Sequence, residues 1–353
     1  MNWRPTHLRD PRIDSALPAQ REAWATAAVR AQVAFALRNV PFWSSRLKQA
    51  GIDPERIDDL QDFAHVPPLS KENLRQLSPW DLVLPSSRSR LSLCRSTSGT
   101  TGVPTSVFWT RADWRALIET MVRLLTAHRP DMDLVAFNGY HQGHAAAPAY
   151  DDAMRLLGGI SIPRHYLADD EPSTVAQLRA FGCNTLILAQ RSGLTKSGRT
   201  VEDLLRYEPA FFSHCAIRWW LGSSSTFTAE VRETARQQGV TSVTNLYGSS
   251  EFGTLAVSCC QNPGEFHLAL GHVLVEVVDR EGFPVPSGHR GRIVVTHLLA
   301  SHEGGGLGPH EGSQLLRLDN GDEATFLDGP CPCGLSSPRI RDIRRRGAPA
   351  AED

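Results

Sequence analysis

The feature of the sequence that most constrains its fold is an alternation, from about residue 91, of short apolar runs with helix-like segments. The apolar runs, rich in β-branched and aromatic residues, are Val135–Phe137, Thr185–Ala189, Ala216–Leu221 and Ser242–Leu246. Segments with helical spacing lie around and between them, at residues 111–128, 172–180 and 228–238. Such an alternation predicts an α/β fold built on a largely parallel sheet.

The regions on either side of this central pattern differ from it. Residues 1–90 are mainly helical by their spacing, because Arg21–Leu47 carries apolar residues at helical intervals until Pro41 interrupts them. Ser70 is placed to cap a further helix. After Gly253 we expect an antiparallel or barrel-like section with strands at His272–Val278, Arg292–His297 and Leu315–Leu318.

These patterns divide the chain into four expected parts. They are a helical segment over residues 1–90, an α/β core over 91–253, a β-rich section over 254–346 and a frayed tail over 347–353. The glycine-rich run His302–Ser313 is expected to be a flexible loop.

Charge and hydropathy exclude several classes of function. The chain has 353 residues with 37 basic and 38 acidic side chains, a formal net charge of −1. Near neutrality gives no electrostatic reason to bind nucleic acid or an anionic membrane, so neither partner is expected. The apolar runs fall far short of the ~18–20 residues of a spanning helix, and Arg4, Arg9 and Arg12 interrupt any signal peptide. We therefore expect a cytoplasmic protein.

The decapeptide Ser96–Thr105 carries the clearest chemical signal. It holds five hydroxyl residues and two glycines before Pro104. Glycines let backbone N–H groups converge on an anion and hydroxyls add donors, so the loop suits a polyphosphate. It is not a Walker A loop, because no Lys-Ser or Lys-Thr pair follows Gly102. The alternative is a polar surface turn.

A second segment, Tyr247–Glu251, reads Tyr-Gly-Ser-Ser-Glu after a short predicted strand. An aromatic face can hold a base, and a carboxylate beside a phosphate needs a divalent cation. Together with the upstream loop, this segment resembles the adenylate-forming superfamily, in its phenylacetate–CoA ligase branch. The resemblance covers most of the chain, and its N-terminal part is carried by Asn39–Trp43, Gly51–Pro54 and Pro68–Arg75.

The resemblance implies the fold of the large N-terminal domain of these enzymes, mostly parallel α/β subdomains with a barrel-like β section. It also implies that Tyr247 stacks on adenine, that Ser250 contacts the α-phosphate of ATP and that Glu251 carries Mg²⁺. The implied catalytic residues are Thr100, Thr101, Ser250 and Glu251. The other implied ATP-binding residues are Ser96, Thr97, Ser98, Gly99, Gly102, Gly222, Ser223, Ser224, Gly248, Asp322 and Arg339.

Two segments depart from the family's pattern. Where the family has Arg-Tyr-Arg-Thr-Gly-Asp, whose aspartate binds the ribose hydroxyls, Arg317 and Asp322 match but residues 318–320 differ. Ribose binding by Asp322 is still implied, and the alternative is an exposed aspartate in an Asn-Gly turn. Near Gly222, Ser224 and Ser225 replace the family's acidic residue and proline, a change that backbone contacts to adenine could survive.

The cysteines suggest a metal site. The chain has seven, an odd number that argues against a disulfide framework. Cys260, His267, Cys331 and Cys333 supply four soft or borderline ligands, which suit a closed structural zinc site, and some relatives carry the same elements. Cys259 competes with Cys260, although Cys260 fits the family's spacing better. Buried thiols without a metal are the alternative.

The segment Asn138–His144 falls where the family has its aromatic, glycine-rich acyl-binding segment. The resemblance makes Tyr140, His141 and Gly248 candidates to line the pocket of an aromatic carboxylic acid. A purely structural histidine at position 141 is the alternative.

Lysine is confined to Lys48, Lys71 and Lys196 among the 37 basic residues. In relatives, a mobile C-terminal domain brings in a lysine for adenylation and builds the thiol-binding tunnel. Because no lysine follows Lys196 and the sequence stops at Asp353, we expect that domain to be missing. Adenylation would then be slower by about 10²–10³ unless a partner supplies the cation.

The resulting hypothesis is ATP-dependent activation of an aryl carboxylic acid as its acyl-adenylate, with release of pyrophosphate. Truncated relatives act in bacterial secondary metabolism, including phenazine antibiotic pathways, where a separate acyltransfer enzyme receives the acyl group. A homodimer is a candidate assembly. One alternative activates another oxyanion, such as nitrite, as a diazotase would. A second is a non-catalytic adenylate-binding subunit, against which the retained Tyr247, Glu251 and Asp322 argue.

Overall fold

The computed structural model describes residues 14–96, 105–141, 146–164, 170–191, 199–301 and 307–346. The chain divides into two compact units. Among the described residues, the first unit is the continuous stretch Met121–Pro263. The second unit combines the chain up to Thr120 with the chain from Gly264 onward, so it is built from two distant parts of the sequence.

The first unit is a mainly parallel sheet with helices on both faces. Its strands, in spatial order, are β4 (Ile160–Pro163), β3 (Val135–Asn138), β5 (Thr185–Ile187), β6 (Trp219–Gly222), β7 (Ser242–Ser249) and β8 (Gly253–Ser258). Of these, β8 runs antiparallel to β7, and the pairs from β4 to β7 are parallel. The predicted α/β class with a largely parallel sheet is thereby confirmed.

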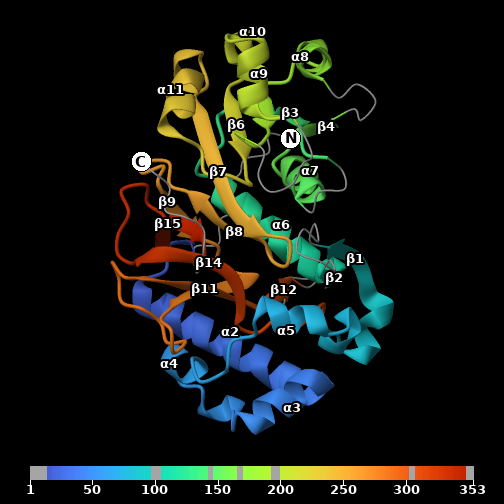
Figure 1. The fold of residues 1–353 in the computed structure, drawn as a ribbon, viewed down its shortest axis with the longest axis vertical. Helices are drawn as coiled ribbons and strands as arrows, with labels where there is room; N and C mark the ends of the chain where they lie inside the picture. The colour runs from blue at the N-terminus through green and yellow to red at the C-terminus, as the bar shows by residue number, and fades with distance from the viewer. Residues whose placement is uncertain are drawn as a thin grey trace. The chain divides into compact units, whose positions relative to one another are not determined.

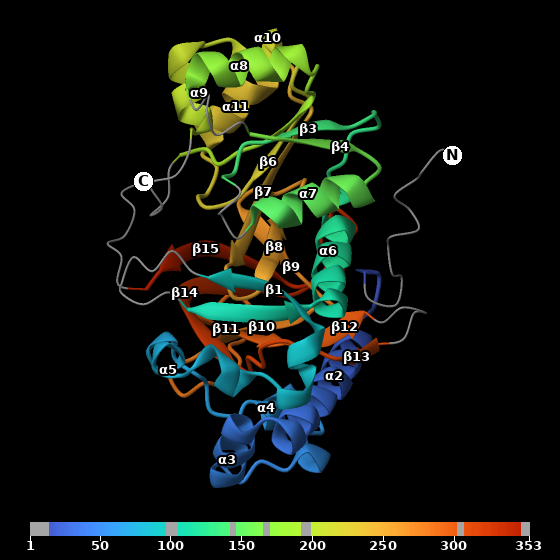
Figure 2. The same ribbon diagram turned by 90° about the vertical axis from the view of Figure 1, so that its right-hand side faces the viewer.

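The helices of the first unit lie on opposite sides of this sheet. They are α7 (Ala147–Leu156), α8 (Glu171–Ala180), α9 (Val201–Tyr207), α10 (Phe211–His214) and α11 (Ala229–Gln237). Figure 2 shows α8–α11 on one side of β3–β6 and α7 on the other. Helix α6 (Arg111–Leu125) begins in the second unit and ends in the first.

The core of the first unit lies between the sheet and α8–α11. Phe211 and Phe212 stack with ring centroids 4.1 Å apart, and Trp220 stacks on Phe227 at 4.0 Å. The Trp220 indole N–H donates to the carbonyl of Leu188 at 2.9 Å, so burial leaves its polar group satisfied. This core packs against the sheet whose strands β3, β6 and β7 carry the predicted site segments at their carboxyl ends.

The second unit combines an antiparallel sheet with the N-terminal helices. Its sheet strands, in spatial order, are β10 (Val273–Val278), β11 (Arg290–His297), β14 (Leu318–Leu327), β15 (Arg339–Arg345) and β9 (Glu265–Leu268). Two further antiparallel pairs are β1 (Leu91–Ser96) with β2 (Ser106–Thr110), and β12 (Leu299–Ser301) with β13 (Leu307–Pro309).

Apart from the beginning of α6, the described helical elements of the second unit precede β1 in sequence. They are α2 (Pro18–Asn39), α3 (Pro41–Gln49), η2 (Pro54–Arg56), α4 (Leu60–Phe63), α5 (Lys71–Gln76), η3 (Pro79–Leu82) and η4 (Pro85–Arg90). Figures 1 and 2 show α2–α5 together on one side of β11. The interruption predicted at Pro41 is confirmed, and the Ser70 hydroxyl accepts from the Asn73 N–H at 3.0 Å as a helix cap should.

Arg317 links these helices to the sheet from a fully buried position. Its guanidinium donates to the carbonyls of Ala64, Val66 and Gly282, and its Nε donates to the Glu276 carboxylate at 3.2 Å. A charge removed from water is tolerated when its donors are satisfied in this way. The indole N–H of Trp43 makes a second link, to the carbonyl of Gln314 at 2.7 Å.

Two predictions about the second unit are wrong. Leu315–Leu318 is not a strand: β14 begins only at Leu318, because Arg317 adopts a left-handed backbone conformation with φ +46°. The expected flexible loop is also wrong over residues 307–313, where β13 forms and His310 and Ser313 are buried. Residues 302–306 lie outside the described part of the chain. No helix within the described ranges is long and apolar enough to cross a membrane.

Candidate functional site

Three segments predicted from the sequence follow strands β3, β6 and β7 of the first unit. Tyr140 and His141 follow β3, Gly222 ends β6 before Ser223 and Ser224, and Tyr247–Glu251 lies at the end of β7. The carboxyl ends of parallel strands open on one edge of a sheet, and α/β proteins bind their ligands there. The topology therefore places the predicted acyl and adenine segments on the same edge.

The acyl and adenine segments are in direct contact through Tyr140. Its hydroxyl donates to the Ser223 carbonyl at 2.9 Å and accepts from the Ser223 N–H at 2.6 Å. Burial raises the pKa of the Tyr140 phenol, so it stays protonated and keeps both roles. The ring stacks on Tyr150 at 5.2 Å. His141, by contrast, is exposed.

At two positions in these segments only glycine fits, because the backbone of a neighbouring segment passes too close for a Cβ atom. A Cβ on Gly222 would stand 2.3 Å from the Leu188 carbonyl oxygen, and one on Gly248 would stand 2.3 Å from the carbonyl oxygen of Gly253. Side chains at either position would push the strands apart. Both glycines therefore hold the segments close to the sheet.

Asn245 supports the loop after β6, a role that the sequence analysis missed. Its Nδ2 donates to the carbonyls of Gly222 at 3.3 Å and Ser225 at 3.0 Å, and its Oδ1 accepts from the Phe227 N–H at 3.2 Å. An asparagine inside an apolar strand is the signal that could have revealed it. Ser224, where the family has an acidic residue, takes a left-handed φ of +79° in this loop.

The segment at the end of β7 combines accessible and buried groups. Tyr247 and Ser250 are half-buried, whereas Glu251 is 2% exposed. A carboxylate with so little water must be paired, hydrogen-bonded or bound to a cation. Its role toward Mg²⁺ stays a prediction.

Of the glycine-rich loop the structure describes only the two end residues, Ser96 and Thr105, which lie in the second unit. Ser96 ends β1, Ser106 begins β2, and their hydroxyl oxygens lie 2.8 Å apart. Thr97, Ser98, Gly99, Thr100, Thr101 and Gly102 lie outside the described residues.

The strand that leaves this loop is anchored by Asp113, which the sequence analysis also missed. The Asp113 carboxylate accepts from the N–H and hydroxyl of Thr110, at 2.9 and 2.7 Å, and from the Gly312 N–H at 2.9 Å. Buried His310 lies 3.3 Å away and stacks on His297 at 4.0 Å. Burial, and after it a neighbouring histidine, lowers the pKa of His310 to about 3. The Thr-x-x-Asp spacing of a capping box is the signal for this anchor.

Asp322 and Arg339, the other predicted nucleotide ligands of the second unit, each have a partner in the protein. Asp322 is half-buried and accepts from Arg345 at 3.3 Å. Arg339 is buried and forms an ion pair with Glu265 at 2.6 Å. Their roles toward ribose and ATP stay predictions.

A compact group of potential metal ligands consists of Cys259, His267, Cys331 and Cys333. Their ligand atoms all lie within 4.8 Å of one another. Cys259 is 1% exposed, whereas Cys260, the residue that the sequence favoured, is exposed and outside the group. Both cysteines follow the end of β8, and only the Cys259 side chain is buried. The compact group thus contains Cys259, and the predicted ligand Cys260 lies outside it.

The donor chemistry of this group fits zinc. A tetrahedral ion with ordinary Zn–S and Zn–N bonds separates its ligand atoms by about 3.6–3.8 Å. The Cys333 Sγ lies 3.1 Å from the His267 Nε2, while the His267 Nδ1 lies 3.2 Å from the Ser337 carbonyl. That carbonyl fixes the tautomer and leaves Nε2 for a metal. Burial lowers the pKa of His267 to about 4, which keeps the imidazole in its neutral, metal-binding form.

Comparison with known sequences finds similar proteins among the phenylacetate–coenzyme A ligases. A phenylacetate–coenzyme A ligase of Thermus thermophilus is 28% identical over 327 residues, 89% of this chain and 67% of the relative. A phenylacetate–coenzyme A ligase of Escherichia coli is 26% identical over 298 residues, 82% of this chain and 65% of the relative. The chain therefore spans about two thirds of the length of these ligases. No protein-family profile matches it.

A solved structure supports the fold. An open conformation of 2-hydroxyisobutyryl-CoA ligase, in complex with 2-HIB-AMP and CoA, superposes with a TM-score of 0.80 at 19% identity. The superposition covers 97% of this chain and 80% of that one. The expected architecture, that of the N-terminal domain of adenylate-forming enzymes, is confirmed.

Proposed function

Because this chain is a homologue of the phenylacetate–coenzyme A ligases, we propose that it uses ATP to activate a carboxylic acid as its acyl-adenylate, releasing pyrophosphate. The observation that carries the proposal is the convergence of Tyr140, Gly222 and Tyr247–Glu251 at the carboxyl edge of one parallel sheet. A similar ligase binds an acyl-adenylate, 2-HIB-AMP, and this likeness in fold supports the same chemistry here.

Each of these residues has a definite task in the proposed reaction. The backbone after Gly222 and the ring of Tyr247 hold the adenine between a polar and an aromatic surface. Ser250 donates to the α-phosphate, and Glu251 is the residue that would hold Mg²⁺. A bound Mg²⁺ would neutralise charge that develops on the phosphates. The Tyr140–Ser223 contact fixes the acyl and adenine segments relative to each other, so acid and nucleotide meet in one orientation.

Pyrophosphate exchange into ATP tests the proposal directly. We expect exchange that depends on an aromatic acid such as phenylacetate, and its loss in Glu251→Gln. The matched control is Glu230→Gln on α11, an exposed position that should leave exchange unchanged. Exchange stimulated by nitrite but by no carboxylic acid would favour the oxyanion alternative. Nucleotide binding without any exchange would favour the non-catalytic one.

The proposal also specifies the type of carboxylic acid, the source of the lysine cation and the acceptor of the acyl group. We propose an aryl acid of secondary metabolism, an acyl group handed to another protein, and a lysine cation from outside these 353 residues. That lysine could belong to a further part of the chain or to a partner. Mass spectrometry of reactions with and without CoA and a candidate acyltransferase tests this form: direct formation of acyl-CoA by the chain alone would contradict it.

The cysteine and histidine group is proposed to hold a structural zinc ion. Its support is the donor set, three thiols and one imidazole, together with the Ser337 carbonyl that orients His267. Elemental analysis after a chelator wash tests it, and less than about a tenth of an equivalent of zinc would refute it.

A further inference from the structure

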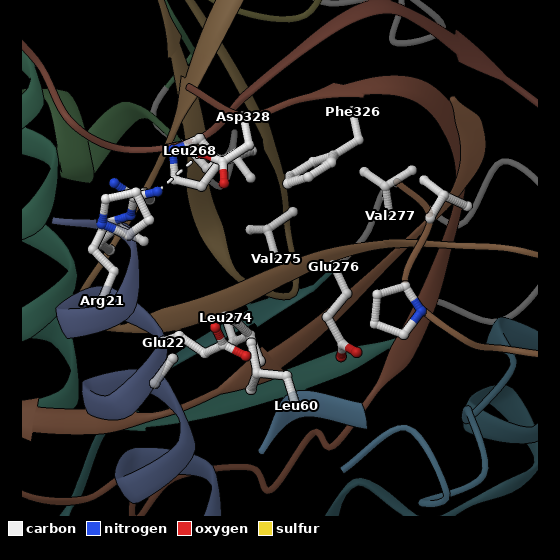
Figure 3. Close-up of a pocket in the computed structure, with 17 residues that line it drawn as sticks. Arg21, Glu22, Leu60, Leu268, Leu274, Val275, Glu276, Val277, Phe326 and Asp328 are labelled. Atoms are coloured by element: carbon white, nitrogen blue, oxygen red, sulfur yellow. Dashed lines mark hydrogen bonds and ion pairs between the residues drawn. The ribbon is translucent and has the colours of Figure 1, made fainter. Parts of the chain in front are cut away.

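A pocket in the second unit lies apart from every residue assigned above to nucleotide, acid or metal. Its volume is about 200 Å³. Helices α2 and α4 and strands β9, β10 and β14 contribute its walls, which are mainly apolar (Figure 3). The central apolar residues are Ala25, Leu60, Leu268, Leu274, Val275 and Phe326.

The pocket runs along the outer edge of β10. This strand ends the strand order of its sheet, and among the described strands only β11 pairs with it. Four consecutive residues of β10, Leu274–Val277, line the pocket. Successive side chains of a strand point to opposite faces, and Figure 3 shows Val275 on the side of Phe326 and Glu276 on the side of Leu60. A pocket bordered by both sets of side chains lies along the edge of the strand.

The register of β10 with β11 shows which backbone groups face this edge. The His272 carbonyl accepts from the Leu298 N–H at 3.0 Å, so position 272 bonds the partner strand. In an antiparallel pair such bonding recurs at every second residue, and the residues between direct both backbone groups away from the partner. The Val277 carbonyl agrees with this alternation, since it accepts from the Val285 N–H at 2.9 Å on the outer side. Val275 therefore directs its N–H and its C=O to the outer edge.

These two groups of Val275 form an unused donor–acceptor pair. Neither group bonds another described residue, and Val275 is 7% exposed. A backbone polar group removed from water costs free energy unless it is hydrogen-bonded. An N–H and a C=O side by side on an edge strand are the groups through which a further strand is added to a sheet. A ligand with a matching acceptor and donor can bond them in the same way.

The size and charge of the pocket restrict that ligand to a small neutral molecule. An apolar protein cavity of about 150 Å³ can bind benzene, so about 200 Å³ accommodates a ring with one or two further heavy atoms. The cation of the lining, Arg21, is already paired with Asp328 at 2.9 Å. Glu22, exposed on α2, is a further carboxylate of the lining, so an anionic ligand is disfavoured.

We propose that this pocket binds a small neutral lactam or primary carboxamide. The ligand's carbonyl accepts from the Val275 N–H, its N–H donates to the Val275 carbonyl, and its apolar part fills the space beside Ala25 and Leu60. A lactam holds its N–H and C=O side by side on one edge of its ring, which matches the two parallel groups of one extended residue. The site is independent of the proposed acid activation, because its residues take no part in that reaction.

The test uses the full chain and the lactam 5-fluoro-2-pyridone, with binding followed by fluorine NMR and calorimetry. We expect saturable binding. The matched control, 5-fluoro-1-methyl-2-pyridone, keeps the carbonyl but lacks the N–H, and it should bind about fivefold more weakly, the effect of one neutral hydrogen bond. Fluorobenzene, which has neither group, should bind more weakly still. Equal affinity for the lactam and its N-methyl derivative, or no saturable binding of the lactam, would overturn the proposal.

Variants locate the binding. Val275→Pro removes the N–H that faces the pocket and keeps the bonds to β11, because proline is tolerated on an edge strand where its nitrogen points away from the ladder. This variant should weaken the lactam at least about fivefold and leave fluorobenzene nearly unchanged. Ala25→Leu should fill the pocket and abolish binding of all three compounds, whereas Ala27→Leu, an exposed change on the same helix, should leave it intact.

A measurement on the wild type replaces Val275→Pro if that variant does not fold. Hydrogen–deuterium exchange at the Val275 amide should slow when the lactam is added, because the ligand's carbonyl then holds that hydrogen. Unchanged exchange at this amide would refute the assignment. Unchanged lactam affinity in a folded Val275→Pro, or in Ala25→Leu, would place the ligand elsewhere and refute it equally.

Discussion

Replacing Arg317 with methionine removes the guanidinium at the centre of the second unit while keeping a side chain of similar length. The change leaves the buried Glu276 carboxylate without its cation. It also deprives the carbonyls of Ala64, Val66 and Gly282 of their donor. All four of these residues are buried, so we expect none of the groups to reach water without local unfolding.

The size of the loss follows from these contacts. Breaking a buried ion pair by removing one partner costs about 3–5 kcal/mol. Each buried carbonyl left without a donor adds about 1–3 kcal/mol unless water reaches it. We therefore expect Arg317→Met to lower the free energy of unfolding by at least about 5 kcal/mol, a large share of the roughly 5–15 kcal/mol of a typical domain. Adding Glu276→Leu should restore about 2 kcal/mol or more, because the orphaned charge is gone.

Urea unfolding followed by tryptophan fluorescence measures both effects, since Trp43 and Trp109 are buried in this unit. The wild type, the two single variants and the double variant form a thermodynamic cycle. A loss below about 1 kcal/mol in Arg317→Met would refute the argument. Simple additivity of the two changes would show that the ion pair contributes nothing specific.

Three further predictions concern the candidate sites and the buried histidine. Tyr140→Phe should raise the KM for ATP about fivefold, since the Ser223 N–H loses an acceptor worth about 1 kcal/mol, while the exposed Tyr207→Phe should not. Cys259→Ser should lower the zinc content measured by elemental analysis, and Cys260→Ser should retain it. Between pH 6.5 and about 3, the free energy of unfolding should fall with falling pH by up to about 1.4 kcal/mol per unit. The unfolded chain protonates His310 in that range and the folded one does not, so urea titrations of His310→Asn should show a shallower slope.

Much of the fold was predictable because local signals agreed with the final packing. The apolar runs around Phe137, Leu186 and Trp220 became parallel strands, and Pro41 and Ser70 set helix ends as their chemistry requires. The strand expected at Leu315–Leu318 failed because Arg317 serves distant carbonyls. That demand bends its backbone in a way that no local pattern records.

The candidate sites were predictable as residue types and segments but not as geometry. Motif spacing led to Tyr247–Glu251 and to the cysteines, yet the choice between Cys259 and Cys260 depends on which face of the chain points inward. Tyr140 stays a predicted residue of the acyl pocket, and the bond of its hydroxyl to the backbone of Ser223 is a contact that no motif indicates. The pocket beside Glu276 joins α2, α4 and β10, so it exists only after long-range packing.

The discontinuous second unit has a consequence for biosynthesis. Its bond from Trp43 to Gln314 joins residues 271 positions apart, and that from Arg317 to Ala64 joins residues 253 apart. On the ribosome, Met121–Pro263 can therefore close into the first unit while the N-terminal helices still lack their sheet. We expect the apolar faces of those helices to stay exposed until the last strands emerge, and such surfaces favour aggregation of incompletely folded chains. We therefore expect completion of the second unit, and with it the burial of Arg317, to be the last step of folding.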